Sequence, residues 1–191
     1  MVFEIFICCG GLAFILAIMA AFYLFSIYNG LIELRNNIDR AFANIDVLLK
    51  QRYDLIPNLV EAVKGYSKYE KGLLSDLASI RTSMMKASTP GEKAKASDAL
   101  SSSLKTVFAV AESYPELKAS ENFMALQKQL TAMENQIADR REFYNNSVLL
   151  YNNKIKSLPD MVIANAMSLK EKEYFKATAE EQKAVEVQMD K

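Results

Sequence analysis

The chain has 191 residues, with 23 basic and 23 acidic side chains and no histidine. A balanced charge of this kind lacks the clustered lysine and arginine that nucleic-acid binding needs. The absence of histidine excludes Ser-His and Cys-His nucleophile pairs and the Glu and His metal sites of helical bundles. Both cysteines, Cys8 and Cys9, lie in an apolar stretch near the N-terminus. The rest of the chain therefore has no disulfide and no thiolate ligand.

The apolar stretch runs from Ile5 to Ile27 without a charged residue. As an α-helix it would extend about 35 Å, enough to cross a hydrocarbon core of about 30 Å. A cleaved signal peptide fits poorly, because no basic residue precedes the stretch and no small-x-small cleavage site ends it. We therefore predict that residues 1–27 are an uncleaved transmembrane anchor in contact with membrane lipid.

The residues beside the anchor indicate its orientation. Arg35 and Arg40 follow the span closely, whereas no basic residue precedes it. By the positive-inside rule, the body of the chain faces the cytoplasm and the N-terminus lies outside.

Small residues lie on one face of the anchor, at spacings of three and four: Gly10, Ala13, Ala17, Ala20 and Ala21. Such a face lets two helix backbones approach closely, which favours self-association in the bilayer. The alternative is that alanine and glycine are simply common in membrane helices. The prediction of a homo-oligomer depends on this choice.

Beyond the anchor, apolar residues recur every seven positions, the pattern of helices that bury one face in a bundle. One row comprises Leu31, Ile38, Ile45, Leu59, Tyr66, Leu73 and Ile80, and a companion row comprises Leu34, Ala41, Leu48, Leu55 and Ala62. Arg52 falls in the first row. Because an unpaired buried charge is costly, we expect Arg52 to pair with a carboxylate such as Glu70, Glu121 or Glu134. A structural ion pair is one interpretation, and a binding or acid–base site is the other.

Pro57 interrupts the helical pattern just after Arg52. Proline lacks a backbone donor and crowds the preceding turn. Either Asp54 caps a new helix with Pro57 in its first turn, or one long helix kinks at Pro57. The seven-residue register favours a kink, and spacing alone leaves the choice open.

The next helix has a clearer start, because Thr89, Pro90 and Glu92 form a capping-box pattern. We expect a helix from there to about Ser113, a turn at Tyr114-Pro115, and a long helix over Ala119–Lys156. The long helix carries a row of Phe123, Leu130, Ile137, Tyr144, Tyr151 and Leu158, and its companion row has Leu126, Met133 and then Arg140, which interrupts the apolar row much as Arg52 does.

Pro159 ends the long helix. A short apolar helix, Met161–Leu169, follows, and then a loosely held tail, residues 170–191, in which Tyr174 and Phe175 are the candidate docking point. The paired Tyr144-Asn145 and Tyr151-Asn152, one heptad apart, have the form of a ligand-binding ladder. The alternative, which we favour, is that the tyrosines pack and the amides bond to neighbouring helices.

Two runs of sequence are distinctive: Arg52-Tyr53-Asp54-Leu55-Ile56-Pro57-Asn58-Leu59-Val60 and Tyr114-Pro115-Glu116-Leu117-Lys118-Ala119 with Glu121-Asn122-Phe123. With Glu70, Arg140, Tyr144, Asn145, Tyr151, Asn152 and Pro159, they resemble the LemA family of bacterial membrane-anchored helical proteins. The family usually has histidine where this chain has Tyr69, so any role of that histidine is absent here. The resemblance implies an all-α fold: one N-terminal transmembrane helix followed by an antiparallel bundle of about four long helices, residues 28–169. It also tips Pro57 toward a helix boundary.

The resemblance further implies a bacterial inner membrane location, no enzyme activity and no cofactor, and without histidine we expect no metal site. One branch of the family takes part in forming magnetosome vesicles, and members are often encoded near membrane proteases. We therefore expect a non-enzymatic membrane-anchored scaffold that self-associates and organises the membrane or recruits partners. The alternative is a regulatory adaptor of a membrane enzyme, such as a quality-control protease.

Overall fold

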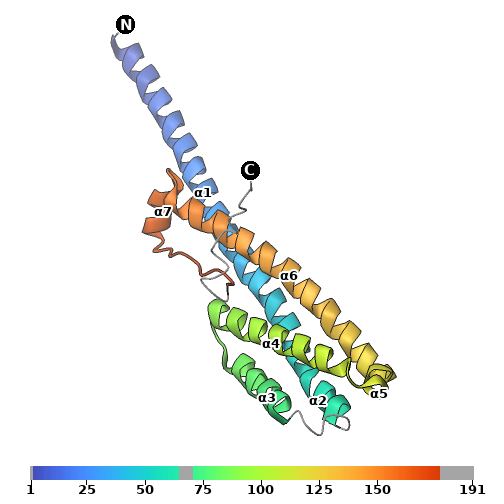
Figure 1. The fold of residues 1–191 in the computed structure, drawn as a ribbon. Helices are drawn as coiled ribbons and strands as arrows, with labels where there is room; N and C mark the ends of the chain where they lie inside the picture. Colours follow the sequence, from blue (N-terminus) through green and yellow to red (C-terminus); the bar gives the residue numbers. More distant parts are fainter. Residues whose placement is uncertain (1, 65–70, 177–191) are drawn as a thin grey trace, which may run out of the picture. The chain divides into compact units, whose positions relative to one another are not determined.

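The computed structural model describes the backbone of residues 2–64 and 71–176, and the side chains of residues 10–64, 72 and 75–176. Every regular element in these residues is an α-helix, which confirms the predicted all-α class. The helices are α1 (Val2–Asp54), α2 (Ile56–Lys64), α3 (Lys71–Lys86), α4 (Pro90–Ala111), α5 (Pro115–Lys118), α6 (Glu121–Lys156) and α7 (Asp160–Ala166) (Figure 1). The chain divides into two compact units, and α1 and α6 contribute residues to both.

The first unit contains the chain up to Arg40 together with residues 146–172. Its part of α1 includes one segment that is long and apolar enough to cross a membrane. Side chains from Gly10 to Ser26 are exposed, and Ile27 is the first buried one. From there on, Leu31 and Ile38 are buried, as are Val148 and Ile155 on α6. Packing within this unit therefore begins where the apolar span ends.

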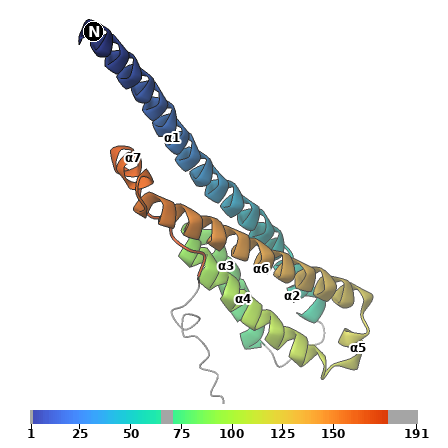
Figure 2. The same ribbon diagram turned by 90° about the horizontal axis from the view of Figure 1, so that it is seen from above.

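The second unit contains residues 41–145 and the chain from Glu173. It is a bundle of the last part of α1, α2, α3, α4 and the first part of α6, in which α3 packs on both α2 and α4 (Figures 1 and 2). Its core is largely aliphatic and also contains buried rings and Arg52. Large side chains with almost no exposure are Ile45, Arg52, Ile56, Leu59, Leu77, Leu100, Leu117, Phe123, Leu130, Ile137, Tyr144 and Phe175. The rows predicted from Ile45 and Phe123 supply much of this core. Tyr66 and Leu73 of the first row lie outside the described side chains.

Pro57 lies at a helix boundary. Helix α1 ends at Asp54, and α2 begins at Ile56, so a single residue, Leu55, separates them. The Leu55 amide donates to the Arg52 carbonyl oxygen over 3.3 Å. Pro57 is the second residue of α2, where the missing backbone donor leaves no hydrogen bond unmade. The break thus combines the two predicted alternatives: a new helix begins here, after an interruption of one residue.

The capping box at α4 is confirmed. Thr89 occupies the N-cap, its hydroxyl oxygen accepts a hydrogen bond from the Glu92 amide at 3.2 Å, and the Glu92 carboxylate accepts from the Thr89 amide at 3.1 Å. After α4, the turn at Tyr114 leads into the short helix α5, which begins at Pro115, and α6 then begins at Glu121. The sequence pattern did not predict α5.

One predicted feature of α6 is wrong. Arg140 is exposed and does not interrupt the core. A straight α-helix drifts by about 20° per heptad relative to a strict seven-residue row, so a long helix rotates such a row away from the core. The next residue, Arg141, is half-buried instead, and Val148 and Ile155 follow it on the inner face. Leu158, the last member of the predicted row, lies beyond the end of α6 and is 72% exposed.

Candidate functional site

Arg52 is the largest side chain that is almost fully buried. Its guanidinium forms an ion pair with Glu134 of α6, and its Nη2 donates a hydrogen bond to the Ser101 hydroxyl of α4 at 3.1 Å. The Ser101 hydroxyl lies 2.8 and 3.0 Å from the two Glu134 carboxylate oxygens. The predicted pairing of Arg52 with a carboxylate is confirmed, and Glu134 is that carboxylate. Glu121 is exposed in the first turn of α6, and Glu70 lies outside the described residues.

The electrostatics of this cluster, Arg52, Ser101 and Glu134, are those of a structural ion pair. Burial lowers the pKa of the Arg52 guanidinium, while the charges of Glu134 and Asp98 oppose that shift. Arginine stays protonated even after a large shift, so the group cannot act as a proton donor near neutral pH. Its Nε and Nη1 have no hydrogen-bond partner among the described residues. The cluster therefore links α1, α4 and α6, and the two arginine nitrogens leave part of its hydrogen-bonding capacity unused among the described residues.

A second arrangement uses neutral side chains. In the first unit, Asn152 is 4% exposed and forms a two-way hydrogen bond with the backbone of Lys172. Its Nδ2 donates to the Lys172 carbonyl oxygen at 3.0 Å, and the Lys172 amide donates to its Oδ1 at 2.9 Å. The neighbouring Tyr151 hydroxyl donates to the Lys170 carbonyl oxygen at 3.2 Å. We call Tyr151 and Asn152 the first rung.

The second unit repeats this pattern one heptad earlier. The Phe175 amide donates to Asn145 Oδ1 at 2.8 Å, and Asn145 Nδ2 donates to the Phe175 carbonyl oxygen at 3.3 Å. The Tyr144 hydroxyl donates to the Glu173 carbonyl oxygen at 2.8 Å. The Phe175 ring is completely buried, edge-on to Tyr144 and 5.2 Å from the Arg141 guanidinium. We call Tyr144 and Asn145 the second rung.

The two rungs share one spacing rule. They are seven residues apart on α6, and both the partners of the asparagines and the partners of the tyrosines are three residues apart. A heptad of α-helix rises about 10.5 Å, close to the length of about 10 Å that three residues span in a fully extended chain. Each asparagine bonds to the backbone, so these hydrogen bonds do not depend on the side chains of Lys172 and Phe175, while the Phe175 ring adds its own contact with Tyr144.

These contacts correct two predictions. The amides of Asn145 and Asn152 bond to the chain's own residues 172 and 175, not to neighbouring helices. The start of the predicted loose tail, residues 170–176, is held by side-chain hydrogen bonds; residues 177–191 lie outside the described part of the chain. The predicted docking point, Phe175, is indeed docked, whereas Tyr174 is half-buried.

The remaining signature residues do not join either arrangement. Asp54, Pro57, Pro115 and Pro159 are exposed, and Tyr114 is half-buried at the N-cap position of α5. Asn58 is exposed at the edge of a 520 Å³ groove between α2 and α6. Among the signature residues, Arg52 therefore belongs to the buried ion pair, and the two tyrosine–asparagine pairs belong to the rungs. The other described signature residues lie at helix boundaries or on the surface.

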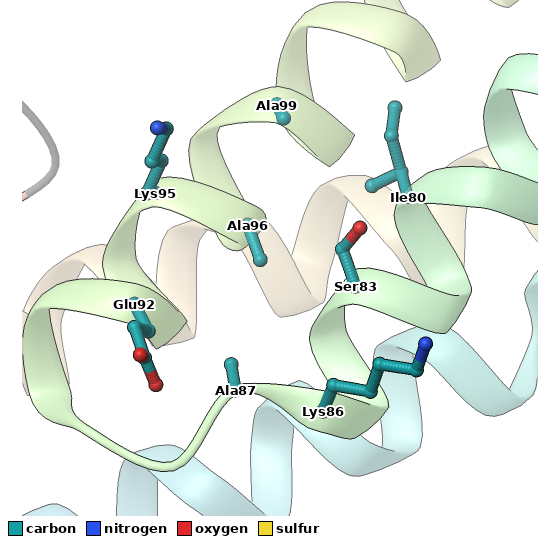
Figure 3. A pocket seen from close by; sticks show the side chains of 8 residues that line it. All are labelled: Ile80, Ser83, Lys86, Ala87, Glu92, Lys95, Ala96 and Ala99. Atoms are coloured by element: carbon teal, nitrogen blue, oxygen red, sulfur yellow. The ribbon is translucent and has the colours of Figure 1, made fainter.

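A cavity of 410 Å³ lies between α3 and α4 (Figure 3). Most of the residues that line it are small or apolar, and three are charged. The lining residues are Ile80, Ser83, Lys86, Ala87, Glu92, Lys95, Ala96 and Ala99. The Glu92 carboxylate is already bonded within the capping box. Small-molecule sites usually combine apolar walls with several convergent polar groups, and this lining does not provide them. No group of three potential metal-ligating side chains occurs among the described residues.

Comparisons with known proteins agree with this architecture. The model of the LemA family matches residues 41–189. The chain is 24% identical over 174 residues to magnetosome protein MamQ 2 of Paramagnetospirillum magneticum, in an alignment that covers 78% of this chain and 64% of that protein. It is 24% identical over 154 residues to protein LemA of Metamycoplasma hominis, covering 78% of this chain and 69% of that one. The chain thus spans less than two thirds of the length of its magnetosome relatives. Since the family model covers most of the chain, this protein belongs to the LemA family.

Proposed function

We propose that this protein is a non-enzymatic scaffold, held by one membrane-spanning helix, that self-associates and organises the membrane or recruits partners. The observation that carries the proposal is the continuity of α1. In the first unit, one helix contains the apolar span and then, without a linker, the buried residues Leu31 and Ile38. Within the first unit, the absence of a linker ties the buried residues closely to the apolar span, which suits a scaffold better than a flexible tether does.

The chemistry of the buried polar groups supports a structural role. Arg52 is neutralised by Glu134, and the Tyr151 and Asn152 side chains bond to the chain's own backbone. These groups therefore do not converge on an open pocket. The names of the relatives fit membrane association, because three of them are called magnetosome proteins.

Self-association has a candidate surface in the anchor. The small-residue face formed by Gly10, Ala13, Ala17, Ala20 and Ala21 is fully exposed in the single chain. Lipid tails are as apolar as leucine side chains, so close backbone packing on small residues is a common reason for membrane helices to associate. A second copy of the same face satisfies that requirement.

The test is the mass of purified full-length protein in detergent, measured by light scattering coupled to size exclusion. We expect a discrete multimer, and we expect Ala17→Leu to shift it toward the monomer. Gly11→Leu, a small-to-large change outside this face, is the matched control and leaves the mass unchanged. A monomer that co-purifies with a membrane protease would overturn self-association and favour the alternative function, a regulatory adaptor.

A further inference from the structure

We propose that the turn between α6 and α7 rests in the headgroup layer of the membrane that holds the anchor, with Leu158 and Val162 inserted among the lipids. This inference builds on the proposed membrane anchoring and adds a second lipid contact to it. Two observations carry it: the exposure of these two side chains, and their level along α1.

Leu158 and Val162 are two of several large apolar side chains that are exposed beyond the span, a group that also includes Phe143 and Leu150. Leu158 is 72% exposed and Val162 is 59% exposed, although both are large and apolar. They lie four residues apart across the start of α7, whose opposite side is buried at Ala164. Two neighbouring apolar side chains that project from a packed unit form a small wedge of the kind that binds at membrane surfaces.

Their level follows from contacts inside the first unit. The charges of Arg35 and Asp39 on α1 act on the Tyr151 hydroxyl, and Lys172, bonded to Asn152, donates to Asp39 at 3.1 Å. Tyr151 therefore lies beside residues 35–39. Within this unit α6 runs antiparallel to α1 (Figures 1 and 2).

Because the two helices are antiparallel, one heptad forward from Tyr151 matches one heptad backward on α1. Leu158 is thus level with residues 28–32, immediately after the apolar span ends at Ile27. These residues lie within about 8 Å of that end along the helix axis. The headgroup layer of each leaflet is about 5–8 Å thick, since a bilayer measures about 40–45 Å with headgroups and about 30 Å without. Leu158 therefore falls within the headgroup layer.

The neighbouring side chains suit this position. Lys154 and Lys156 precede the wedge, and their ammonium groups pair with Asp160 at 3.5 Å and Glu171 at 2.8 Å. Long lysine side chains of this kind can lie along apolar surface while the charged end stays in a polar layer. On α1, the exposed Tyr23, Phe25 and Tyr28 supply aromatic rings at the same boundary. Lipid is therefore the occupant that covers Leu158 and Val162.

The test is the depth of a fluorophore attached to single cysteines in the full-length protein. Cys8 and Cys9 are first changed to alanine, and an environment-sensitive dye is attached to Leu158→Cys or Val162→Cys. Leu150→Cys is the matched control, because Leu150 is 61% exposed, similar to Val162, but lies about 12 Å farther from the membrane along the helix than Leu158. The protein is reconstituted in vesicles of phosphatidylcholine and phosphatidylglycerol at low protein density.

We expect dyes at positions 158 and 162 to emit at shorter wavelength in vesicles and to be quenched by spin-labelled lipids. The dye at position 150 should remain sensitive to a water-soluble quencher. Equal access of that quencher to all three sites would overturn the inference, and so would shielding that increases with protein density without lipid quenching, because a protein partner would then cover the wedge.

A label at Ala20→Cys separates this inference from the anchoring on which it depends. Lipid quenching at position 20 without quenching at 158 and 162 would leave the anchor intact and overturn the wedge alone. Absence of quenching at all of these sites would overturn both. Helical content measured by circular dichroism shows that each variant is folded.

Discussion

The two units bury polar side chains in different ways, and each must offset the free-energy cost of removing those groups from water. In the second unit, Arg52 carries a full charge into the core and depends on Glu134, whose side chain is 41% exposed. In the first unit, Asn152 is neutral, and its amide oxygen and nitrogen both bond to the backbone of Lys172. The charged group retains two unpartnered nitrogens among the described residues, whereas the neutral group has an acceptor and a donor satisfied.

The comparison predicts how much stability each unit loses when one of these polar side chains is removed. Removing the partner of a buried charge leaves that charge uncompensated, which costs more than removing the charge itself. Removing a neutral hydrogen-bonding side chain leaves backbone groups without a partner, which costs about 1–3 kcal/mol where those groups stay buried. We therefore expect the charged cluster to respond asymmetrically to mutation and the neutral rungs to respond locally.

The largest effect is expected for Glu134→Ala. The change leaves the Arg52 guanidinium buried, with Asp98 as the remaining negative charge near it. We expect a loss of about 2 kcal/mol in the free energy of unfolding, below the range for fully buried pairs because Glu134 is partly hydrated. Chemical denaturation followed by circular dichroism in detergent measures the change.

Arg52→Met is the comparison variant, because it removes the buried charge and keeps a long apolar side chain. Its loss should be below about 1 kcal/mol, since the freed Glu134 can be hydrated. The double variant should resemble Arg52→Met. If Arg52→Met were the more damaging single change, the asymmetry would be refuted and the cluster would contribute mainly through the hydrogen bonds of the arginine.

The next effect is expected for Asn152→Ala. The change removes both hydrogen bonds to Lys172 and should cost about 1.5 kcal/mol. Because the rung acts on one segment, the loss should appear as faster amide exchange at Lys172 before global unfolding changes. Hydrogen exchange read by mass spectrometry measures it. Asn153→Ala, at an exposed position on the same helix, is the matched control, and equal exchange in both variants would show that the rung does not hold the segment.

Much of the fold can be predicted from the sequence, because its signals are local or periodic. The capping box at Thr89 depends on residues three apart, and the apolar rows on a repeat of seven. The need of Arg52 for a carboxylate also follows from its place in such a row. The choice of Glu134 among three candidates does not follow, because it depends on which turn of α6 faces α1.

The rungs could be located from the sequence, but their partner could not. Hydrogen bonds from a side chain to backbone groups impose no pattern on the side chains of the segment that is bound, so residues 170–176 carry no periodic signal. Seven residues of α-helix and three residues of extended chain have similar lengths. The seven-residue spacing of Tyr144-Asn145 and Tyr151-Asn152 was therefore the available signal for partners three residues apart. Arg140 was misplaced for a different reason, the drift of a straight helix relative to a strict heptad.

A smaller effect distinguishes the two neighbouring arginines of α6. Arg141 is half-buried, 2.7 Å from an Asp98 oxygen, and stacks on Phe175, whereas Arg140 is exposed. Arg141→Ala should cost about 1 kcal/mol, and Arg140→Ala should stay within about 0.5 kcal/mol. Thermal unfolding of the two variants side by side measures the difference. Equal losses would indicate that the strict heptad row, with Arg140 inward, describes the molecule better.

The smallest effect concerns the pH dependence of the first rung. Burial raises the pKa of the Tyr151 hydroxyl, with a further increase from Asp39 that Arg35 opposes. The unfolded chain loses this proton near pH 10, before the folded chain does, so the contribution of Tyr151 is fully present below that pH and falls as pH rises toward the folded pKa. The ionised oxygen also can no longer donate to the Lys170 carbonyl oxygen. Tyr151→Phe should therefore lose stability slightly at pH 8 and differ less from the parent chain at pH 11, while Asn152→Ala should show no such convergence. If the difference in the free energy of unfolding between Tyr151→Phe and the parent stayed constant across this range, the hydroxyl would titrate as it does in water. The first rung could then no longer be contrasted with Arg52 as a buried neutral arrangement.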